Sequence, residues 1–123
     1  MVNALNWFEL PTADFDRAVT FYNAILDSQL QRVDFMGVPN AFFPYQQEGG
    51  VGGALIYEVD RKPTSEGARI FLNVNDKLDA VLSRIEMAGG SIVLPKTDIG
   101  QPGLIALIID SEGNLVGLHA EHK

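Results

Sequence analysis

The sequence has no cysteine among its 123 residues. This absence excludes a disulfide framework, a thiolate nucleophile and a zinc site built on cysteine. Lysine and arginine number 9 against 16 aspartates and glutamates, which gives a net charge of −7. An acidic surface repels nucleic acid, and no basic cluster counters that repulsion. No apolar run reaches the roughly 20 residues that span a bilayer. We therefore expect neither nucleic acid nor a membrane as a partner.

The first ten residues contain neither a basic leader nor a small-residue cleavage pattern. Together with the absence of cysteine, this predicts a cytoplasmic protein. The remaining composition, 46% hydrophobic and 20% charged, is ordinary for a globular chain. A chain of this length is expected to form one domain over residues 1–123, made of two small units that share a core.

The spacing of apolar residues predicts the same series twice: strand, helix, strand, strand, strand. The strands are expected at 4–10, 29–36, 39–45 and 54–59, then at 68–74, 91–95, 104–110 and 115–121. Asp14 and Asp76 are predicted to cap the two helices, and Gly89-Gly90 to end the second one. The units are therefore expected at about 4–59 and 68–121.

A constant offset supports a duplication. Trp7 and Arg69 lie 62 residues apart (69−7), as do Ile56 and Leu118 (118−56). The two predicted helix caps have the same separation. The shared order of elements is stronger support than any single pair, and it predicts two copies of one βαβββ unit.

Side chains alternate between the two faces of a strand, so each strand can be divided into two sets. An aliphatic set is expected to carry the helices: Phe8, Leu10, Ala54, Ile56, Ile70, Leu72, Val74, Val116 and Leu118. The other set mixes aromatic, charged and amide groups: Trp7, Glu9, Leu55, Tyr57, Arg69, Phe71, Asn73, Gly117 and His119. Such a mixture is typical of a ligand cleft. The alternative is an interface or a wet sheet surface on which Glu9 pairs with Arg69.

Several motifs accompany the repeat. They are WFELP at residues 7–11, DFDRAVTFY at 14–22, PKTDIG at 95–100 and EGNLVGLH at 112–119. With the βαβββ repeat, the chain resembles the vicinal oxygen chelate superfamily over nearly its whole length. That superfamily includes glyoxalase I, extradiol dioxygenases, fosfomycin-resistance enzymes and metal-free bleomycin-binding proteins. The motifs look most like those of a group of small glyoxalase-like proteins.

The resemblance implies an α+β fold in which two βαβββ units wrap a half-closed sheet cleft, with the helices outside. It also implies a homodimer, since family members commonly dimerise. Metal-dependent members place ligands at the start of the first strand and on the last strand of each unit. The matching positions here are Trp7, Arg69, Gly117 and, from the offset, Leu55. None of these side chains offers a lone pair to a divalent cation, so we expect no metal and no other cofactor.

Glu9 and His119 are the candidate catalytic residues, because each lies two residues beyond a lost ligand position. The alternative to a metal-free cleft is a displaced metal site formed by these two groups. His119 is suited to acid–base work near neutral pH, or is a satisfied structural histidine.

The candidate ligand-binding residues are Trp7, Tyr57, Arg69, Phe71 and Asn73. Trp7 either stacks against a ligand or only packs in the core. Arg69 either clamps a carboxylate or phosphate bidentately or pairs with Glu9. Of Phe42 and Phe43, adjacent on one strand, only one can face the cleft.

We therefore predict a glyoxalase-like protein that binds a small anionic or aromatic molecule in the cleft, with or without turnover. One alternative is a metal-dependent lyase or isomerase that uses Glu9 and His119. Another is a non-catalytic drug-binding protein of the bleomycin-resistance type. Whether the protein is an enzyme stays open; as an enzyme it would be a glyoxalase-like lyase or isomerase, or a relative of the dioxygenases.

Overall fold

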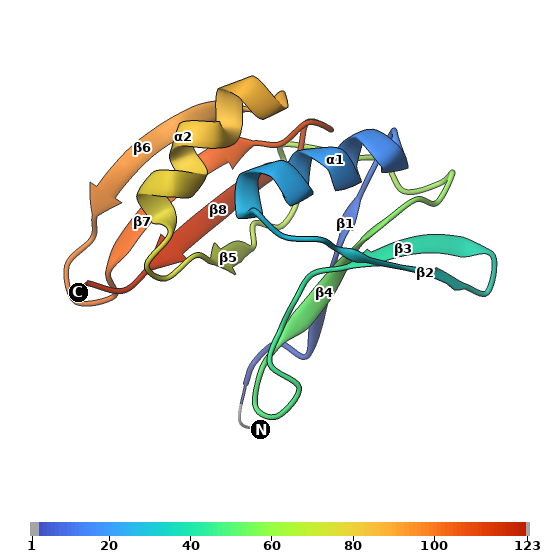
Figure 1. Cartoon of the computed structure of the whole chain (residues 1–123), viewed down its shortest axis with the longest axis horizontal. Helices are drawn as coiled ribbons and strands as arrows, with labels where there is room; N and C mark the ends of the chain where they lie inside the picture. The colour runs from blue at the N-terminus through green and yellow to red at the C-terminus, as the bar shows by residue number, and fades with distance from the viewer. Residues whose placement is uncertain (1–2, 123) are drawn as a thin grey trace.

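The computed structural model describes residues 3–122 (Figure 1). Its elements are β1 (Trp7–Pro11), α1 (Phe15–Leu26), β2 (Gln31–Phe35), β3 (Val38–Phe42), β4 (Gly52–Ile56), β5 (Phe71–Asn73), α2 (Leu78–Ala88), β6 (Ser91–Asp98), β7 (Leu104–Ile109) and β8 (Leu115–Ala120). The predicted order of elements is confirmed. The strand predicted at 68–74 was too long, since β5 has three residues and Arg69 lies before it.

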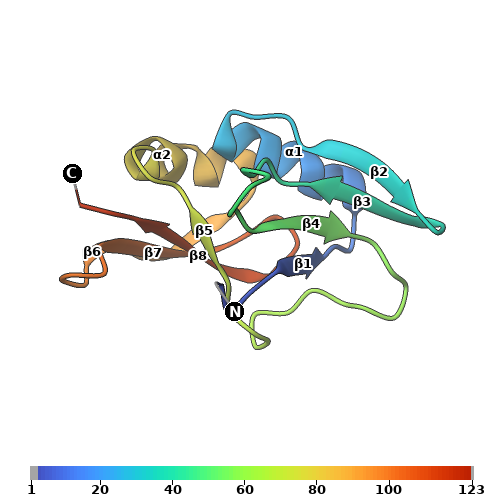
Figure 2. The same ribbon diagram turned by 90° about the horizontal axis from the view of Figure 1, so that it is seen from below.

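Each series forms its own four-stranded mixed sheet. Sheet 1 has the order β1-β4-β3-β2 and sheet 2 the order β5-β8-β7-β6. In both sheets the first strand is parallel to the last, and the other pairs are antiparallel. Figure 2 shows both helices on the same side of the sheets, where they pack together. The protein is thus α+β with two βαβββ units. Within residues 3–122, neither helix is long and apolar enough to cross a membrane.

Both ends of helix α1 are defined by local capping, at Asp14 and at Asp27. The Oδ1 atom of Asp14 accepts a hydrogen bond from the N–H of Arg17 at 3.1 Å, which confirms the predicted cap. At the other end, Asp27 adopts a left-handed conformation, with φ of 50°. The helix buries one apolar face, formed by Ala18, Val19, Phe21, Tyr22 and Ile25.

The start of helix α2 differs from the sequence prediction. Asp76 does not cap it: Asp76 has φ of 65°, and Lys77 stands at the N-cap without a side-chain hydrogen bond. The reason is one extra residue in the turn before the helix. The first helical residues, Phe15 and Leu78, are 63 apart (78−15), not 62. Gly89, with φ of 110°, ends the helix as predicted.

The extra residue also corrects the face assigned to β4. Leu10 pairs with Leu55 in sheet 1, and Leu72 pairs with Leu118 in sheet 2. Leu118 therefore corresponds to Leu55, at an offset of 63, and not to Ile56. Leu55 is fully buried in the core beneath the helices, so its predicted place on the cleft face is wrong.

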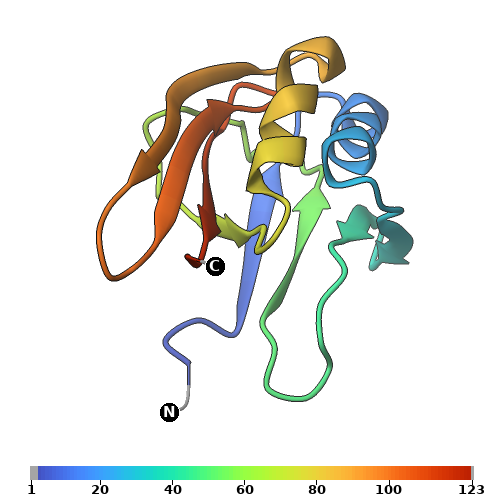
Figure 3. The ribbon, with the colours of Figure 1, turned by 60° about the vertical axis from the view of Figure 1, so that its left-hand side comes forward.

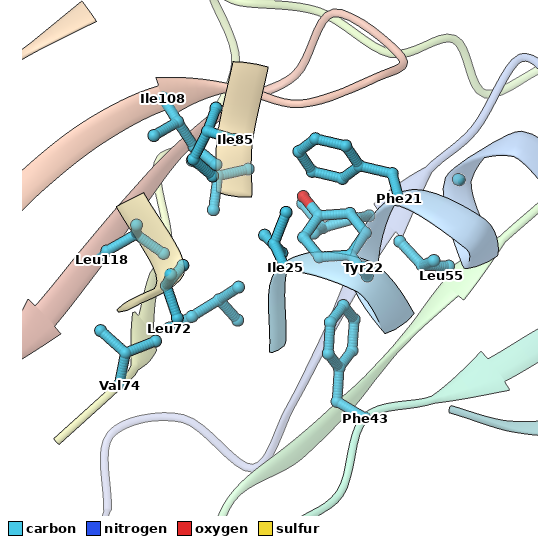
Figure 4. Close-up of a cluster of buried hydrophobic side chains, with 14 of the residues drawn as sticks. Phe21, Tyr22, Ile25, Phe43, Leu55, Leu72, Val74, Ile85, Ile108 and Leu118 are labelled. Carbon is cyan, nitrogen blue, oxygen red and sulfur yellow. The ribbon is translucent and has the colours of Figure 1, made fainter. Parts of the chain in front are cut away.

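One hydrophobic core joins the two units (Figure 4). Side chains from α1 and from sheet 1 meet side chains from α2 and sheet 2 in one cluster. Its large members include Phe21, Tyr22, Ile25, Phe43, Leu55, Leu72, Ile85, Ile108 and Leu118. Because each unit contributes ten of the 20 buried residues in this cluster, neither unit buries its apolar face without the other.

A buried polar network at Asp110 also crosses between the units. Its Oδ2 atom accepts hydrogen bonds from the hydroxyl of Tyr22 at 2.7 Å and from Nδ2 of Asn114 at 3.1 Å. The same Asn114 nitrogen donates to the carbonyl of Pro11. Burial, with the neighbouring Asp110 carboxylate, raises the pKa of Tyr22 well above its usual value. The hydroxyl therefore remains a donor, and the network holds α1 against the turn between β7 and β8.

Glu112, in that same turn, caps helix α1 from outside. Its Oε1 atom accepts hydrogen bonds from the N–H groups of Ala13 at 2.9 Å and Asp14 at 2.7 Å. Arg17 adds an ion pair at 2.8 Å, and the Glu112 side chain is fully buried. Burial on its own would raise the pKa of Glu112, but the hydrogen bonds from Arg17, Asp14, Ser111 and Ala13 outweigh it and hold that pKa below its usual value.

Candidate functional site

The face of the two sheets opposite the helices carries most of the residues predicted to form a site. We call it the helix-free face. By strand pairing it includes Trp7, Glu9, Phe42, Ala54 and Ile56 in sheet 1, and Phe71, Asn73, Ile105, Leu107, Gly117 and His119 in sheet 2. The structure therefore confirms the predicted division of β1, β5 and β8, and it replaces Leu55 by Ala54 and Ile56.

Trp7 belongs to an aromatic group at one end of sheet 1. Its ring centroid lies 5.3 Å from that of Phe42 and 6.1 Å from that of Tyr45, and both contacts are edge-on. Gly52, opposite Trp7 on β4, is needed because a Cβ there would collide with the Tyr45 ring. Figure 3 shows β1 and β4 side by side, with the β3–β4 connection turning back at the same end as the N-terminus. Trp7 is half-buried, and its position is fixed by packing.

Phe71 and Asn73 lie on the helix-free face of sheet 2. The Phe71 ring lies over Gly117, where a Cβ would collide with it, and 46% of Phe71 is exposed. The Oδ1 atom of Asn73 accepts a hydrogen bond from the N–H of Asn75 at 3.0 Å, so one side of this amide is used by the local turn. Phe71 is thus the more open of the two toward a ligand.

His119 pairs with Asn73 across β8 and β5, as the alternation predicted. Its Nε2 atom lies within hydrogen-bond distance of the carbonyl oxygen of Pro102 in the β6–β7 loop. Since a carbonyl can only accept, Nε2 carries the proton in this arrangement. The loop comes this close through Gly103, whose φ of 120° suits glycine. The contact favours a structural role for Nε2 and leaves Nδ1 as the free nitrogen.

Arg69 and Glu9 do not form the ion pair considered from the sequence. The ion pairs found among residues 3–122 involve other carboxylates, and both Arg69 and Glu9 are exposed. Tyr57 is 40% exposed and lies one residue beyond β4, so strand pairing does not assign it to either face.

Two open hollows lie on the surface of residues 3–122, and neither was predicted from the sequence. One, of about 340 Å³, is lined by Gln29, Gln31, Phe42, Phe43, Pro44, Tyr45 and Gln47. The other, of about 290 Å³, lies at the start of α2 and is lined by Asp76, Leu78, Asp79, Ala80, Lys96, Leu104, Ala120 and Glu121. Neither includes a predicted site residue. The predicted residues on β1, β5 and β8 thus share a face, but they lie outside both of these hollows.

Comparison with known proteins agrees with this fold. The model of the glyoxalase/bleomycin resistance protein/dioxygenase superfamily matches residues 4–118. The chain belongs to that superfamily. A relative in Mycobacterium bovis, named "Putative glyoxylase CFP32", is 30% identical over 117 residues, which cover 92% of this chain and 44% of the relative. The chain therefore spans less than half the length of the curated relatives it matches.

Solved structures show the same fold at low sequence identity. A glyoxalase/bleomycin resistance protein from Albidiferax ferrireducens has a TM-score of 0.74 at 12% identity, covering 98% of this chain and 100% of that one. The fosfomycin resistance protein FosX from Listeria monocytogenes has a TM-score of 0.65 at 17% identity, covering 100% of this chain and 94% of that one. Identities this low support the fold alone.

The side chains at the metal positions implied by the superfamily do not fit a divalent cation. In the corrected register, Ala54 pairs with Glu9 in sheet 1 as Gly117 pairs with Phe71 in sheet 2. Ala54 therefore replaces Leu55 as the fourth of the implied metal-ligand positions. Trp7, Arg69, Gly117 and Ala54 offer no oxygen or imidazole donor. Within residues 3–122, no three His, Asp or Glu side chains gather closely enough to hold a metal ion.

Proposed function

We propose that the protein binds a small carboxylate- or phosphate-bearing molecule with an apolar body on its helix-free face. The observation that carries this proposal is the pair formed by Arg69 and Phe71 at the start of β5. Arg69 has no ion-pair partner among residues 3–122, and 46% of the Phe71 side chain is exposed beside it. A guanidinium binds such anions bidentately, and an aromatic ring provides an apolar wall.

The backbone around Ile70 supports a common direction for these two side chains. Ile70 packs against the core, and its carbonyl accepts a hydrogen bond from the N–H of Gly117 at 2.8 Å. Extended backbone sends neighbouring side chains to opposite faces. With Ile70 directed to the core, we infer that Arg69 lies on the same side as Phe71, toward the helix-free face.

We further propose that a second copy of the chain completes the site. The predicted residues of the two sheets lie outside both hollows described above: Trp7 and Glu9 in sheet 1, Phe71 and His119 in sheet 2. A two-fold dimer would join the same surface of both copies, and we propose that this surface is the helix-free face. In such a dimer Trp7, Tyr57 and Asn73 are proposed ligand contacts, and Glu9 and His119 are the proposed acid–base groups.

The proposal is tested by the binding of benzoate, with benzyl alcohol as its neutral counterpart, measured by calorimetry or by NMR titration. Arg69→Ala should weaken benzoate binding at least about tenfold, because a charge-assisted bidentate contact contributes roughly 1.5–3 kcal/mol. The binding of benzyl alcohol should stay nearly unchanged.

Arg61→Ala is the matched control, since Arg61 is an exposed arginine in the connection between β4 and β5. It should leave the affinity for benzoate unaltered. An equal loss of affinity for benzoate and for benzyl alcohol in Arg69→Ala would show that Arg69 only supports the fold. An equal loss of affinity for benzoate in both variants would mean that the effect comes from the net charge of the protein and not from a specific contact with Arg69.

A further inference from the structure

The hollow at the end of β3 differs in chemistry from the rest of the surface. Its seven lining residues, Gln29, Gln31, Phe42, Phe43, Pro44, Tyr45 and Gln47, include no charged side chain, although 20% of the chain is charged. Three are amides and three are aromatic. The hollow of about 340 Å³ lies within the size range of small-molecule sites.

The aromatic wall of this hollow is held in place from behind. Tyr45 and Phe42 both make edge-on contacts with Trp7, and Tyr45 occupies the space that glycine leaves at position 52. Phe43 is 5% exposed and packs against Phe8 at 5.4 Å in the core. A wall fixed in this way binds a flat ring without losing much side-chain freedom.

The rim of the hollow provides unused hydrogen-bonding groups. The Oε1 atom of Gln29 accepts a long hydrogen bond of 3.4 Å from Asn23. The side chains of Gln31 and Gln47, in contrast, make no hydrogen bond within residues 3–122. Each glutamine amide is both a donor and an acceptor, so it complements the edge of another amide or of a lactam. Gln31 also pairs with Phe42 across β2 and β3, which places one amide beside the aromatic wall.

We infer that this hollow is a second binding site, which takes a neutral planar heteroaromatic ring with an amide-like edge. The ring lies against Phe42 and Tyr45, and its polar edge meets Gln31 and Gln47. The inference goes beyond the anion site, because it requires neither Arg69 nor a second copy of the chain.

Nicotinamide is a suitable probe, followed by NMR in the full chain. The protein has one tryptophan, so the indole signal of Trp7, which contacts Phe42 and Tyr45, is easily assigned, and the Gln31 and Gln47 side-chain amides distinguish the hollow from the anion site. We expect saturable shifts of that signal and of the Gln31 and Gln47 side-chain amides. Cyclohexanecarboxamide, which has the amide but no aromatic face, should bind several-fold more weakly.

The double variant Gln31→Leu, Gln47→Leu should weaken nicotinamide at least about tenfold, through the loss of two hydrogen bonds. Gln46→Leu is the matched control, because Gln46 lies in the same loop but does not line the hollow. Arg69→Ala should leave nicotinamide binding unchanged. Shifts that do not saturate, or affinity equal in the double variant and the wild type, would overturn the inference. Saturable shifts that centre on Phe71 and leave Gln31 and Gln47 unmoved would overturn it too, because they would place nicotinamide at β5.

Discussion

At the scale of single residues, Asp110 is a buried side chain on which four hydrogen bonds converge. Its carboxylate accepts from the hydroxyl of Tyr22, from the N–H of Glu112, and from both the N–H and the side chain of Asn114. Only 3% of Asp110 is exposed, and all four donors are uncharged. The helix of one unit and the turn of the other thus depend on one buried acceptor.

Asp110→Ala should lower the free energy of unfolding by about 3 kcal/mol, because it leaves buried donors of Tyr22 and Asn114 without partners. Tyr22→Phe removes the hydroxyl donor together with its hydrogen bond, and should lower the free energy of unfolding by only about 1 kcal/mol. Urea unfolding measures both changes. Equal losses in the two variants would mean that the remaining donors find other acceptors, and that the network is not the link described.

The residue scale also shows what a pattern can and cannot predict. Phe71 and His119 were predicted to lie on one face because alternation in a strand fixes direction. The hollow beside Gln31 and Gln47 was missed because its lining comes from strand ends and an irregular loop, where no period applies. Gly52 was the available signal, since a side chain elsewhere, here Tyr45, has to fill the space it leaves.

At the scale of elements, the turn between β7 and β8 serves as the N-terminal cap of α1. Glu112 accepts hydrogen bonds from the N–H groups of Ala13 and Asp14, at the positive end of the helix dipole. The N-terminus of α1 is therefore capped by a residue about one hundred positions away in the sequence. Local sequence identified Asp14 as a cap, but Glu112 could not be assigned this role without the fold.

Because the folded pKa of Glu112 lies below the usual 4.5, its ionised form stabilises the fold. That contribution is complete above the unfolded pKa and is lost as the pH falls through the folded pKa. Glu112→Gln should therefore destabilise the protein near neutral pH by about 1 kcal/mol. It should also reduce the further loss of stability on acidification.

The measurement is urea unfolding at a series of pH values, with Glu86→Gln as the control, an exposed glutamate on α2. If the two variants had the same dependence on pH, the hydrogen bonds to Glu112 would not be what lowers its pKa.

The order of elements was predictable because each helix and strand has a clear period. Register across the repeat was not, because a single residue added near Asp76 shifts everything after it by one. That shift moved both the predicted cap of α2 and the predicted face of β4. A repeat inferred from one offset is therefore safe for the order of elements but not for assigning side chains to faces.

At the scale of the whole molecule, the helix-free face is open only in part: among the described residues, Ala54 and Ile56 are buried, whereas 46% of Phe71 is exposed. Its exposed apolar side chains include Phe71, and the proposed dimer would cover them. The dimer should have a mass of about 26.8 kDa, twice the 13.4 kDa of the chain. Light scattering at a series of concentrations measures it.

Phe71→Asp should weaken self-association at least about tenfold, since it places a charge in the proposed interface. Met87→Asp is the matched control, because Met87 lies on the outside of α2 and is 95% exposed. A wild-type mass of 13.4 kDa at every concentration, or an equal effect of the two variants, would contradict the proposed dimer.

The most direct test of the account is calorimetry of benzoate binding to protein stripped of metal with a chelator. A metal-free anion site at Arg69 predicts saturable binding that is unaffected by the chelator and at least about tenfold weaker in Arg69→Ala. Binding that appears only after a divalent metal is restored, and that depends on Glu9 and His119 instead of Arg69, would contradict it.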